Sequence, residues 1–179
     1  MEINFKTCTE EELWKYVGGH LSKNGIEAVL VGGAVVSIYS NGAYRSGDLD
    51  FIVLSLFKSK IEPIMKKIGF NKQGRHYVHP ECEHLFVEFP PGPLGIGEDH
   101  DIEPLEKMEG EEKFKILSPT DCIKDRLASY IYFKSKEGLD QAVLVARKQP
   151  FKKTEVKRWC KEEGAESAFL DFLEALKSE

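Results

Sequence analysis

The first 25 residues alternate apolar and polar positions with the period of an amphipathic helix. Thr9 and Glu12 have the form of a capping box, a common start of a helix. Apolar residues follow at every fourth position until Asn24 and Gly25 end the pattern. The chain is therefore predicted to begin with a helix that buries one face.

Short apolar runs then indicate strands. The segments "EAVLVGG" and "DLDFIVL" predict two strands, joined by a short helix over residues 34–39 that begins on the glycines. A surface helix is predicted over residues 57–68. Two further strands, "RHYVH" and "HLFVEF", flank the turn "PEC", and "FKILS" predicts a last short strand. The Pro- and Gly-rich "PPGPLGIGED" predicts a loop.

From Ser118 onward the pattern is helical. Ser118 is a good N-cap with Pro119 at the first helical position, and three or four helices are expected from there to the C-terminus. The predicted fold class is α/β (α+β). A mixed β-sheet with flanking helices is expected over residues 1–117, and a helical region packed on this core over residues 118–179.

Composition supports one compact domain, with or without a small helical appendage. The chain has 179 residues, 41% of them hydrophobic and 31% charged. Its apolar runs are shorter than the about 20 residues that cross a bilayer, and its N-terminus is acidic where an export signal would be basic. We therefore expect a cytoplasmic protein without a membrane partner. The four cysteines lie far apart and are expected to be reduced thiols.

Two acids begin the otherwise apolar run "DLDFIVL". Side chains alternate between the faces of a strand, so Asp48 and Asp50 are expected on one face, with Leu49 and Phe51 on the other. Two carboxylates in one small region repel each other, and a divalent cation removes that repulsion. Carboxylate oxygens, completed by water and phosphate, are ligands that Mg²⁺ prefers. The acids therefore suggest a metal site.

The glycine pair at residues 32–33 adds a second feature. Gly32 and Gly33 end one predicted strand and begin a helix, where backbone N–H groups are unpaired and an anion is favoured. Because glycine has no Cβ, a phosphate can approach the backbone closely. Acids on one strand and a phosphate-binding turn on another suggest metal-assisted phosphoryl or nucleotidyl transfer.

The segment "LVGGAVVSIYSNGAYRSGDLDFIV" resembles the signature of the nucleotidyltransferase superfamily related to DNA polymerase beta. That signature has an apolar strand, Gly-Gly or Gly-Ser, a short helix, and Asp-x-Asp on the next strand. "VEFPPGPLGIG" and "SPTDCIKDRLASYIYF" are similar to segments of small prokaryotic proteins akin to the toxin nucleotidyltransferases of abortive-infection systems. The resemblance covers roughly residues 26–148 and implies a minimal nucleotidyltransferase fold.

The resemblance also implies roles for individual residues. Asp48 and Asp50 would hold two Mg²⁺ ions, for which Mn²⁺ could substitute, and Glu88 would complete the metal site and orient the attacking hydroxyl. The nucleoside triphosphate would be bound by Gly32, Gly33, Arg45, Ser46 and Lys124. Where the family often has serine, this chain has Gly33, which offers only its backbone. Lys124 is equally compatible with a plain surface role.

The stretch "HYVHPECEH" contains four side chains that could bind zinc: His76, His79, Cys82 and His84. Their spacing matches no compact zinc motif, so structural or hydrogen-bonding roles are favoured. A zinc-dependent hydrolase built on them is the alternative. Because His84 shares a strand face with Glu88, it is expected near the catalytic centre.

A basic stripe and an acidic loop complete the candidates. Lys153, Lys157 and Lys161 recur at helical spacing, which is typical of a solvated face and is also the best candidate for docking an RNA acceptor. "GPLGIGEDHD" predicts a flap beside the site, with Asp99 and Asp101 solvated.

We expect transfer of a nucleoside monophosphate from a triphosphate to an acceptor that is RNA, protein or a small molecule. The alternative function is a catalytically silent module of the toxin–antitoxin type, which binds nucleotide or an antitoxin partner.

Overall fold

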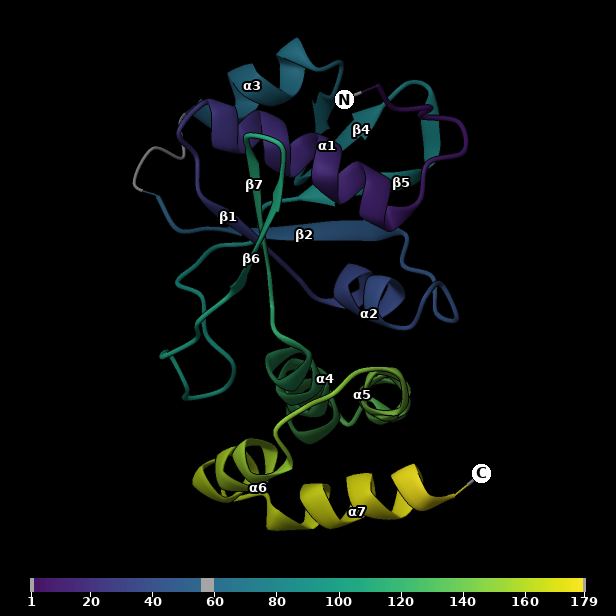
Figure 1. Ribbon diagram of the computed structural model, residues 1–179, viewed down its shortest axis with the longest axis vertical. Helices are drawn as coiled ribbons and strands as arrows, with labels where there is room; N and C mark the ends of the chain where they lie inside the picture. The colour runs from purple at the N-terminus through teal and green to yellow at the C-terminus, as the bar shows by residue number, and fades with distance from the viewer. Residues whose placement is uncertain (1, 56–59, 179) are drawn as a thin grey trace.

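The computed structural model describes residues 2–55 and 60–178. These residues form one seven-stranded mixed sheet with helices on both sides (Figure 1). The strands are β1 (Ala28–Val31), β2 (Asp48–Val53), β3 (Asn71–Gln73), β4 (His76–His79), β5 (Cys82–Glu88), β6 (Leu105–Glu109) and β7 (Glu112–Ile116). The helices are α1 (Glu10–Lys23), α2 (Gly33–Tyr39), α3 (Ile61–Lys67), α4 (Pro119–Phe133), α5 (Lys136–Lys148), α6 (Lys153–Glu162) and α7 (Glu166–Lys177).

The strand order is β3-β4-β5-β2-β1-β7-β6, which places β2 at the middle of the sheet. β1 runs antiparallel to β2 and parallel to β7, and β2 runs parallel to β5. The expected mixed sheet is thus confirmed. Because β2 lies between β1 and β5, its side chains are next to the strand that leads to the glycine pair and to the strand that ends in Glu88.

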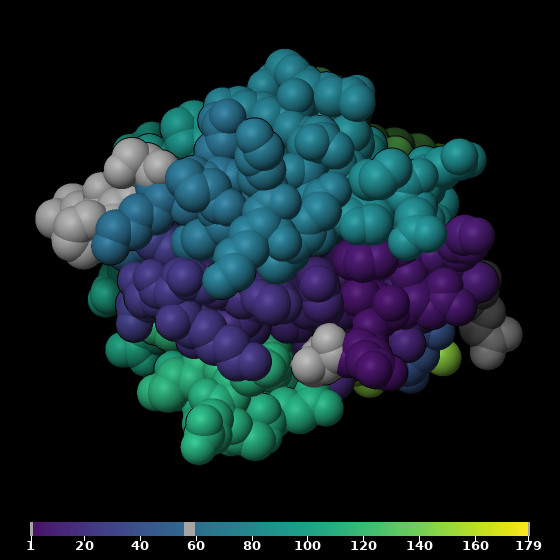
Figure 2. All heavy atoms as spheres, turned by 90° about the horizontal axis from the view of Figure 1, so that it is seen from above, coloured from purple at the N-terminus to yellow at the C-terminus, as the bar shows by residue number. Residues whose placement is uncertain are grey.

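Helix α1 covers one face of the sheet. Thr9 accepts a hydrogen bond from the backbone N–H of Glu12, and the Glu12 side chain accepts one from the N–H of Thr9, so the predicted capping box is present. The helix buries Leu13, Trp14 and Val17 completely. Seen from above, α1 lies between the segment of α3 to β4 and the hairpin of β6 and β7 (Figure 2).

Helix α2 lies on the other side of the sheet, and α4 and α5 pack beyond it, with α6 and α7 farther out (Figure 1). Ser118 caps α4 through the N–H of Asp121, with Pro119 in the first turn as predicted. The hydroxyl of Tyr39 donates to the carbonyl of Leu117 at 2.6 Å, and the Gln149 amide donates to the carbonyl of Tyr39 at 2.9 Å. These bonds attach the helical C-terminal part to the end of α2.

The sequence pattern did not predict strands β3 and β6. β3 is a polar tripeptide with all three residues exposed, and β6 is exposed along its whole length. Both are edge strands, so neither carries the alternation of buried and exposed positions that identifies a strand. Positions 57–59 of the helix predicted over residues 57–68 lie outside the described residues. Among the residues that the structure does describe, no helix has both the length and the apolar character needed to cross a membrane.

Candidate active site

Three carboxylates meet where β2 lies beside β5. Asp48 and Asp50 point to one face of β2 and are partly exposed, whereas Leu49 and Phe51 are fully buried on the other. Asp50 pairs in register with Glu88 on the parallel strand β5. Directly paired residues in a sheet have neighbouring side chains on the same face. The fold therefore gathers two acids that lie two positions apart in the sequence with a third that lies 38 positions after Asp50.

The electrostatics of this group penalise full ionisation. Burial raises the pKa of Asp50 to about 6, and the negative charges of Asp48 and Glu88 act in the same direction. The guanidinium of Arg126 opposes them only in part. At neutral pH the protein thus holds a carboxylate that would be stabilised by a cation.

The glycine pair lies against these acids. A Cβ atom at Gly32 would lie 2.9 Å from Oδ2 of Asp50, and one at Gly33 would lie 2.8 Å from Oγ of Ser46. Gly32 also has φ of 74° and ψ of −151°, a conformation that other residues rarely adopt. The structure therefore places the backbone of the glycine turn in contact with the acidic strand and the segment that leads to it.

The segment before β2 is held by a buried carboxylate on α1. The hydroxyl of Ser46 donates to Asp48 at 2.7 Å, and its backbone N–H donates to Glu10 at 3.0 Å. Arg45 also binds Glu10, at 2.8 Å, so its guanidinium is directed to α1. Burial opposes ionisation of Glu10, but its hydrogen bonds, including those from Ser37, Arg45 and Ser46, lower its pKa overall. Glu10 is a positioning residue that the sequence did not reveal.

Glu88 contacts two basic side chains, His76 on β4 and Arg75 just before it. Its carboxylate lies 2.7 Å from Nε2 of His76 and 3.3 Å from Nε of Arg75. His76 pairs in register with Glu88 across β4 and β5. The histidine beside Glu88 is thus His76. The expectation that His84 lies there is wrong, because His84 stands four residues earlier on β5 and bonds to the backbone of Cys8.

The donor set fits Mg²⁺ in its chemistry, because it consists of hard carboxylate oxygens. Burial and repulsion from the neighbouring acids raise the pKa of Asp50, and a bound cation would offset both effects. Among the described residues, the oxygen atoms of the three carboxylates do not all lie within 4.8 Å of one another. Glu88 instead contacts His76 and Arg75. Shared coordination of one ion by all three would require Glu88 to exchange these partners.

Comparison with solved structures identifies the architecture. An antigenic nucleotidyltransferase-like protein from Paracoccidioides brasiliensis superposes with a TM-score of 0.60 at 13% sequence identity, covering 90% of this chain and 92% of that one. The antibiotic-resistance factor ANT(2'')-Ia superposes with a TM-score of 0.56 at 9% identity, covering 89% of this chain and 93% of the other. The chain has the nucleotidyltransferase fold. No protein-family model and no curated protein matches the sequence.

Within this nucleotidyltransferase fold, Lys124 and Arg126 occupy different surroundings. The ammonium of Lys124 is buried between Asp99 and Asp121, at 2.9 Å from each. Asp99 is therefore ion-paired rather than solvated as predicted, whereas Asp101 is exposed. These contacts direct Lys124 toward the acidic loop.

Arg126 is the basic residue that sequence reasoning missed. Its side chain is 16% exposed, forms an ion pair with Asp125 at 2.5 Å, and hydrogen-bonds Gln141 at 3.2 Å. Its positive charge partly offsets the rise in the pKa of Asp50, so it influences the acidic site electrostatically. Tyr44 lies in the same region, because its ring would contact a Cβ at Gly33. Burial raises the pKa of Tyr44, and the charge of Arg126 partly offsets that rise.

The cysteine and histidine stretch is divided by the fold. His76 contacts Glu88, and His79 stacks on Phe5 with ring centroids 3.6 Å apart. Cys82 and His84 face Cys8, which precedes α1. A zinc site formed by His76, His79, Cys82 and His84 together is therefore wrong, because these side chains do not converge.

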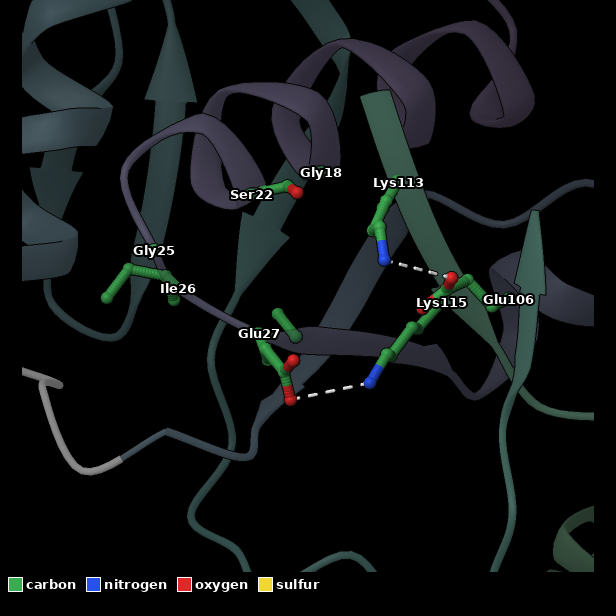
Figure 3. Close-up of a pocket in the computed structure, with 9 residues that line it drawn as sticks. Gly18, Ser22, Gly25, Ile26, Glu27, Glu106, Lys113 and Lys115 are labelled. Carbon is green, nitrogen blue, oxygen red and sulfur yellow. Dashed lines mark hydrogen bonds and ion pairs between the residues drawn. The ribbon is translucent and has the colours of Figure 1, made fainter. Parts of the chain in front are cut away.

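A cavity of about 270 Å³ lies at the other end of β1, between the end of α1 and β6 and β7 (Figure 3). Lys113 pairs with Glu106 and Lys115 with Glu27, each at 3.3 Å. Ala28, which lines this cavity, begins β1, whereas Gly32 follows the end of that strand. The cavity is thus separate from the acids of the nucleotidyltransferase fold, and its charges are already paired.

Proposed function

We propose that the protein transfers a nucleoside monophosphate from a nucleoside triphosphate to an acceptor hydroxyl. One observation carries this proposal: Asp50 is paired in register with Glu88 and touches the backbone of the glycine turn at Gly32. A carboxylate site for a cation thus adjoins the start of α2, where backbone N–H groups have no partner within the helix and favour an anion. The fold is one on which nucleotidyl transfer is known, which supports the proposal by analogy.

Asp48, Asp50 and Glu88 are the residues that would hold Mg²⁺. Two such ions, when bound, polarise the α-phosphate and stabilise the departing pyrophosphate. In the proposed reaction, the acceptor oxygen forms a bond to the α-phosphorus and the bond to the pyrophosphate oxygen breaks. Glu88 orients the acceptor hydroxyl and takes its proton. Ser46 holds Asp48 in place through its 2.7 Å hydrogen bond.

In this proposal, the triphosphate is bound by the glycine turn and by the positive charge of Arg126 on α4. Gly32 and Gly33 begin α2 and offer its first backbone N–H groups, and Arg126 supplies a guanidinium whose charge acts on Asp50. Arg126 is favoured over Lys124, whose ammonium is neutralised by Asp99 and Asp121.

For the acceptor, the basic stripe remains the proposed docking face. Lys153, Lys157 and Lys161 are exposed on α6, whose opposite face buries Val156 and Trp159. Helix α6 packs against α4 and α7. An acceptor on this stripe would therefore have to extend past the helical layer to reach Asp48, which favours a long molecule such as RNA over a small one.

The decisive experiment is a transfer assay with each of the four labelled ribonucleoside triphosphates, Mg²⁺ and a cell extract containing RNA and protein. We expect label to enter one class of macromolecule with the wild type. The double variant Asp48→Asn/Asp50→Asn should lose at least about 100-fold of this activity, because the metal ligands are removed. Asp101→Asn, an exposed acid, is the matched control. Unchanged transfer by the double variant would refute the assignment.

A catalytically silent, nucleotide-binding module is the second candidate. It is favoured by one observation, that the Glu88 carboxylate already contacts His76 and Arg75. Calorimetry with Mg²⁺ and a nucleoside triphosphate, together with absence of label transfer to any extract component, would select this function instead.

A further inference from the structure

A second cluster of side chains with metal-binding chemistry lies away from the three carboxylates. Cys8 immediately precedes the cap of α1, and Cys82 and His84 lie in the first half of β5. The two sulfur atoms are 3.8 Å apart, and Nδ1 of His84 is 4.0 Å from Sγ of Cys82. One ligand atom from each of these residues lies within 4.8 Å of the other two.

The hydrogen bond of His84 fixes which of its nitrogens is free. Nε2 lies 2.8 Å from the backbone carbonyl of Cys8. A carbonyl oxygen can only accept, so Nε2 carries the proton and the lone pair of the neutral ring is on Nδ1. Nδ1 is the nitrogen that faces the sulfur of Cys82. A histidine that binds zinc commonly donates its other N–H to a carbonyl in this way.

The distances also suit a tetrahedral ion. With zinc–sulfur bonds of about 2.3 Å and zinc–nitrogen bonds of about 2.0 to 2.1 Å, tetrahedral angles place two sulfurs about 3.8 Å apart and a sulfur and a nitrogen about 3.5 Å apart. The observed separations are 3.8 Å and 4.0 Å. The two sulfurs thus already have the tetrahedral separation, and the His84 nitrogen, which lies within 4.8 Å of both, has to move closer. The His84 side chain is exposed and has room to do so.

We propose that Cys8, Cys82 and His84 form a Zn²⁺ site, with water in the fourth position. Two thiolates and an imidazole are soft and borderline ligands that select zinc, whereas the Asp48 site offers only oxygen. The ion would connect the segment before α1 to β5, the strand that ends in Glu88. This site does not depend on the proposed nucleotidyl transfer and would exist equally in a silent module.

The test uses the full chain, treated with a chelator under reducing conditions and then titrated with Zn²⁺ alone. We expect about one tightly bound zinc per chain, release of protons on binding, and a rise in melting temperature. Co²⁺ in place of Zn²⁺ should give the thiolate-to-cobalt charge-transfer absorption that oxygen ligands cannot produce. Binding of less than about 0.1 zinc per chain would overturn the proposal.

Variants locate the ion. His84→Gln and Cys82→Ala should each weaken zinc binding at least about 10-fold and reduce the cobalt charge-transfer band. His84 is exposed, so its variant is informative even if Cys82→Ala does not fold. Cys160→Ala, which removes a buried thiol on α6, and the double variant Asp48→Asn/Asp50→Asn should retain the zinc. Unchanged zinc affinity in His84→Gln would overturn the assignment. So would a Cys8–Cys82 disulfide in the purified protein, if the protein bound no zinc after that disulfide had been reduced.

Discussion

The carboxylate of Asp50 lies against Gly32, in the space that a Cβ atom at position 32 would need. A Cβ atom at this position would lie 2.9 Å from Oδ2 of the carboxylate, and the backbone at Gly32 has a positive φ of 74°. The glycine is thus required twice, by its conformation and by the acid beside it. The acid in turn is held where the chain leaves β1.

Gly32→Ala is therefore expected to damage the site more than the fold around it. The methyl group has to displace the Asp50 carboxylate, and the conformation costs about 1 to 3 kcal/mol of unfolding free energy. Transfer activity should fall at least about 100-fold, as expected when a metal ligand moves by about 1 Å. Gly74→Ala, at another positive φ of 62° with open space around it, is the control for strain alone. Equal losses in both variants would contradict the argument.

Asp50→Asn should make the metal-free protein more stable. Burial raises the folded pKa of Asp50 to about 6, above its ordinary value of 3.8, so the ionised form costs folding free energy at neutral pH. Allowing for screening by solvent, removing the charge should raise the free energy of unfolding by about 1 to 2 kcal/mol, which corresponds to about 3 to 6 °C in melting temperature. Chelator-treated proteins at pH 7.5 should be compared by thermal unfolding.

The pH dependence of that difference has a definite sign. Because the folded pKa is the higher one, the penalty in the wild type is complete above about pH 6 and disappears as the pH falls toward the unfolded value of 3.8. The advantage of Asp50→Asn should therefore shrink between pH 6 and pH 4. Asp101→Asn should show no such trend. A variant less stable than the wild type at pH 7.5 without metal would refute the prediction.

Glu10→Gln is expected to loosen the segment before the acids. Glu10 is buried, accepts the N–H of Ser46 and pairs with Arg45, so its replacement should lower the unfolding free energy by about 1 to 3 kcal/mol at pH 7. Its folded pKa is below its unfolded one, so its contribution is complete above the unfolded pKa of about 4.5 and is lost as the pH falls through the folded one.

Urea unfolding of Glu10→Gln across the acid range provides the measurement. The adjacent Glu11→Gln changes an exposed acid paired with Lys15, and is the matched control. Loss of stability that is equal in the two variants would show that Glu10 has no special role in holding Ser46.

Arg126→Gln should weaken the use of nucleotide more than it weakens the fold. Arg126 neutralises part of the charge around Asp50, so its removal should raise the pKa of Asp50 further and lower kcat/KM for the triphosphate by about 10- to 100-fold. Steady-state kinetics against pH would show both effects. Arg158→Gln, at an exposed ion pair with Glu155 and Glu162, should change neither. An unchanged kcat/KM in Arg126→Gln would remove it from the site.

The acidic strand was the part of the site that the sequence could predict. Alternation along β2 correctly gave the common face of Asp48 and Asp50, since the period of two is a local property of a strand. The pairing of Glu88 with Asp50 depends on strand register, which the pattern did not specify. For the same reason, the alternation of side chains predicted the face of β5 on which His84 lies but not its neighbours. The histidine beside Glu88 is His76, which comes from β4.

Residues that act from other layers could not be predicted. Glu10 looked like an ordinary acid in the first turn of a helix, and its contact with Ser46 exists only because α1 crosses the sheet near that segment. Arg126 lies 76 positions after Asp50, and its charge acts on Asp50 only because the helices fold back against the sheet. The acceptor, Mg²⁺, the cytoplasmic location and the likeness to abortive-infection toxins stay predictions.

Helix α2 connects the glycine turn to the helical C-terminal part, so it could couple the binding of two ligands. Its first residue, Gly33, lies against Ser46, and its last, Tyr39, is bonded to Leu117, just before the helical part, and to Gln149 within it. The helix has seven residues, so only about two turns separate these attachments. We expect a ligand clamped at the glycine turn and a partner seated on the helices to alter each other's affinity by one reciprocal factor, the signature of thermodynamic coupling between sites.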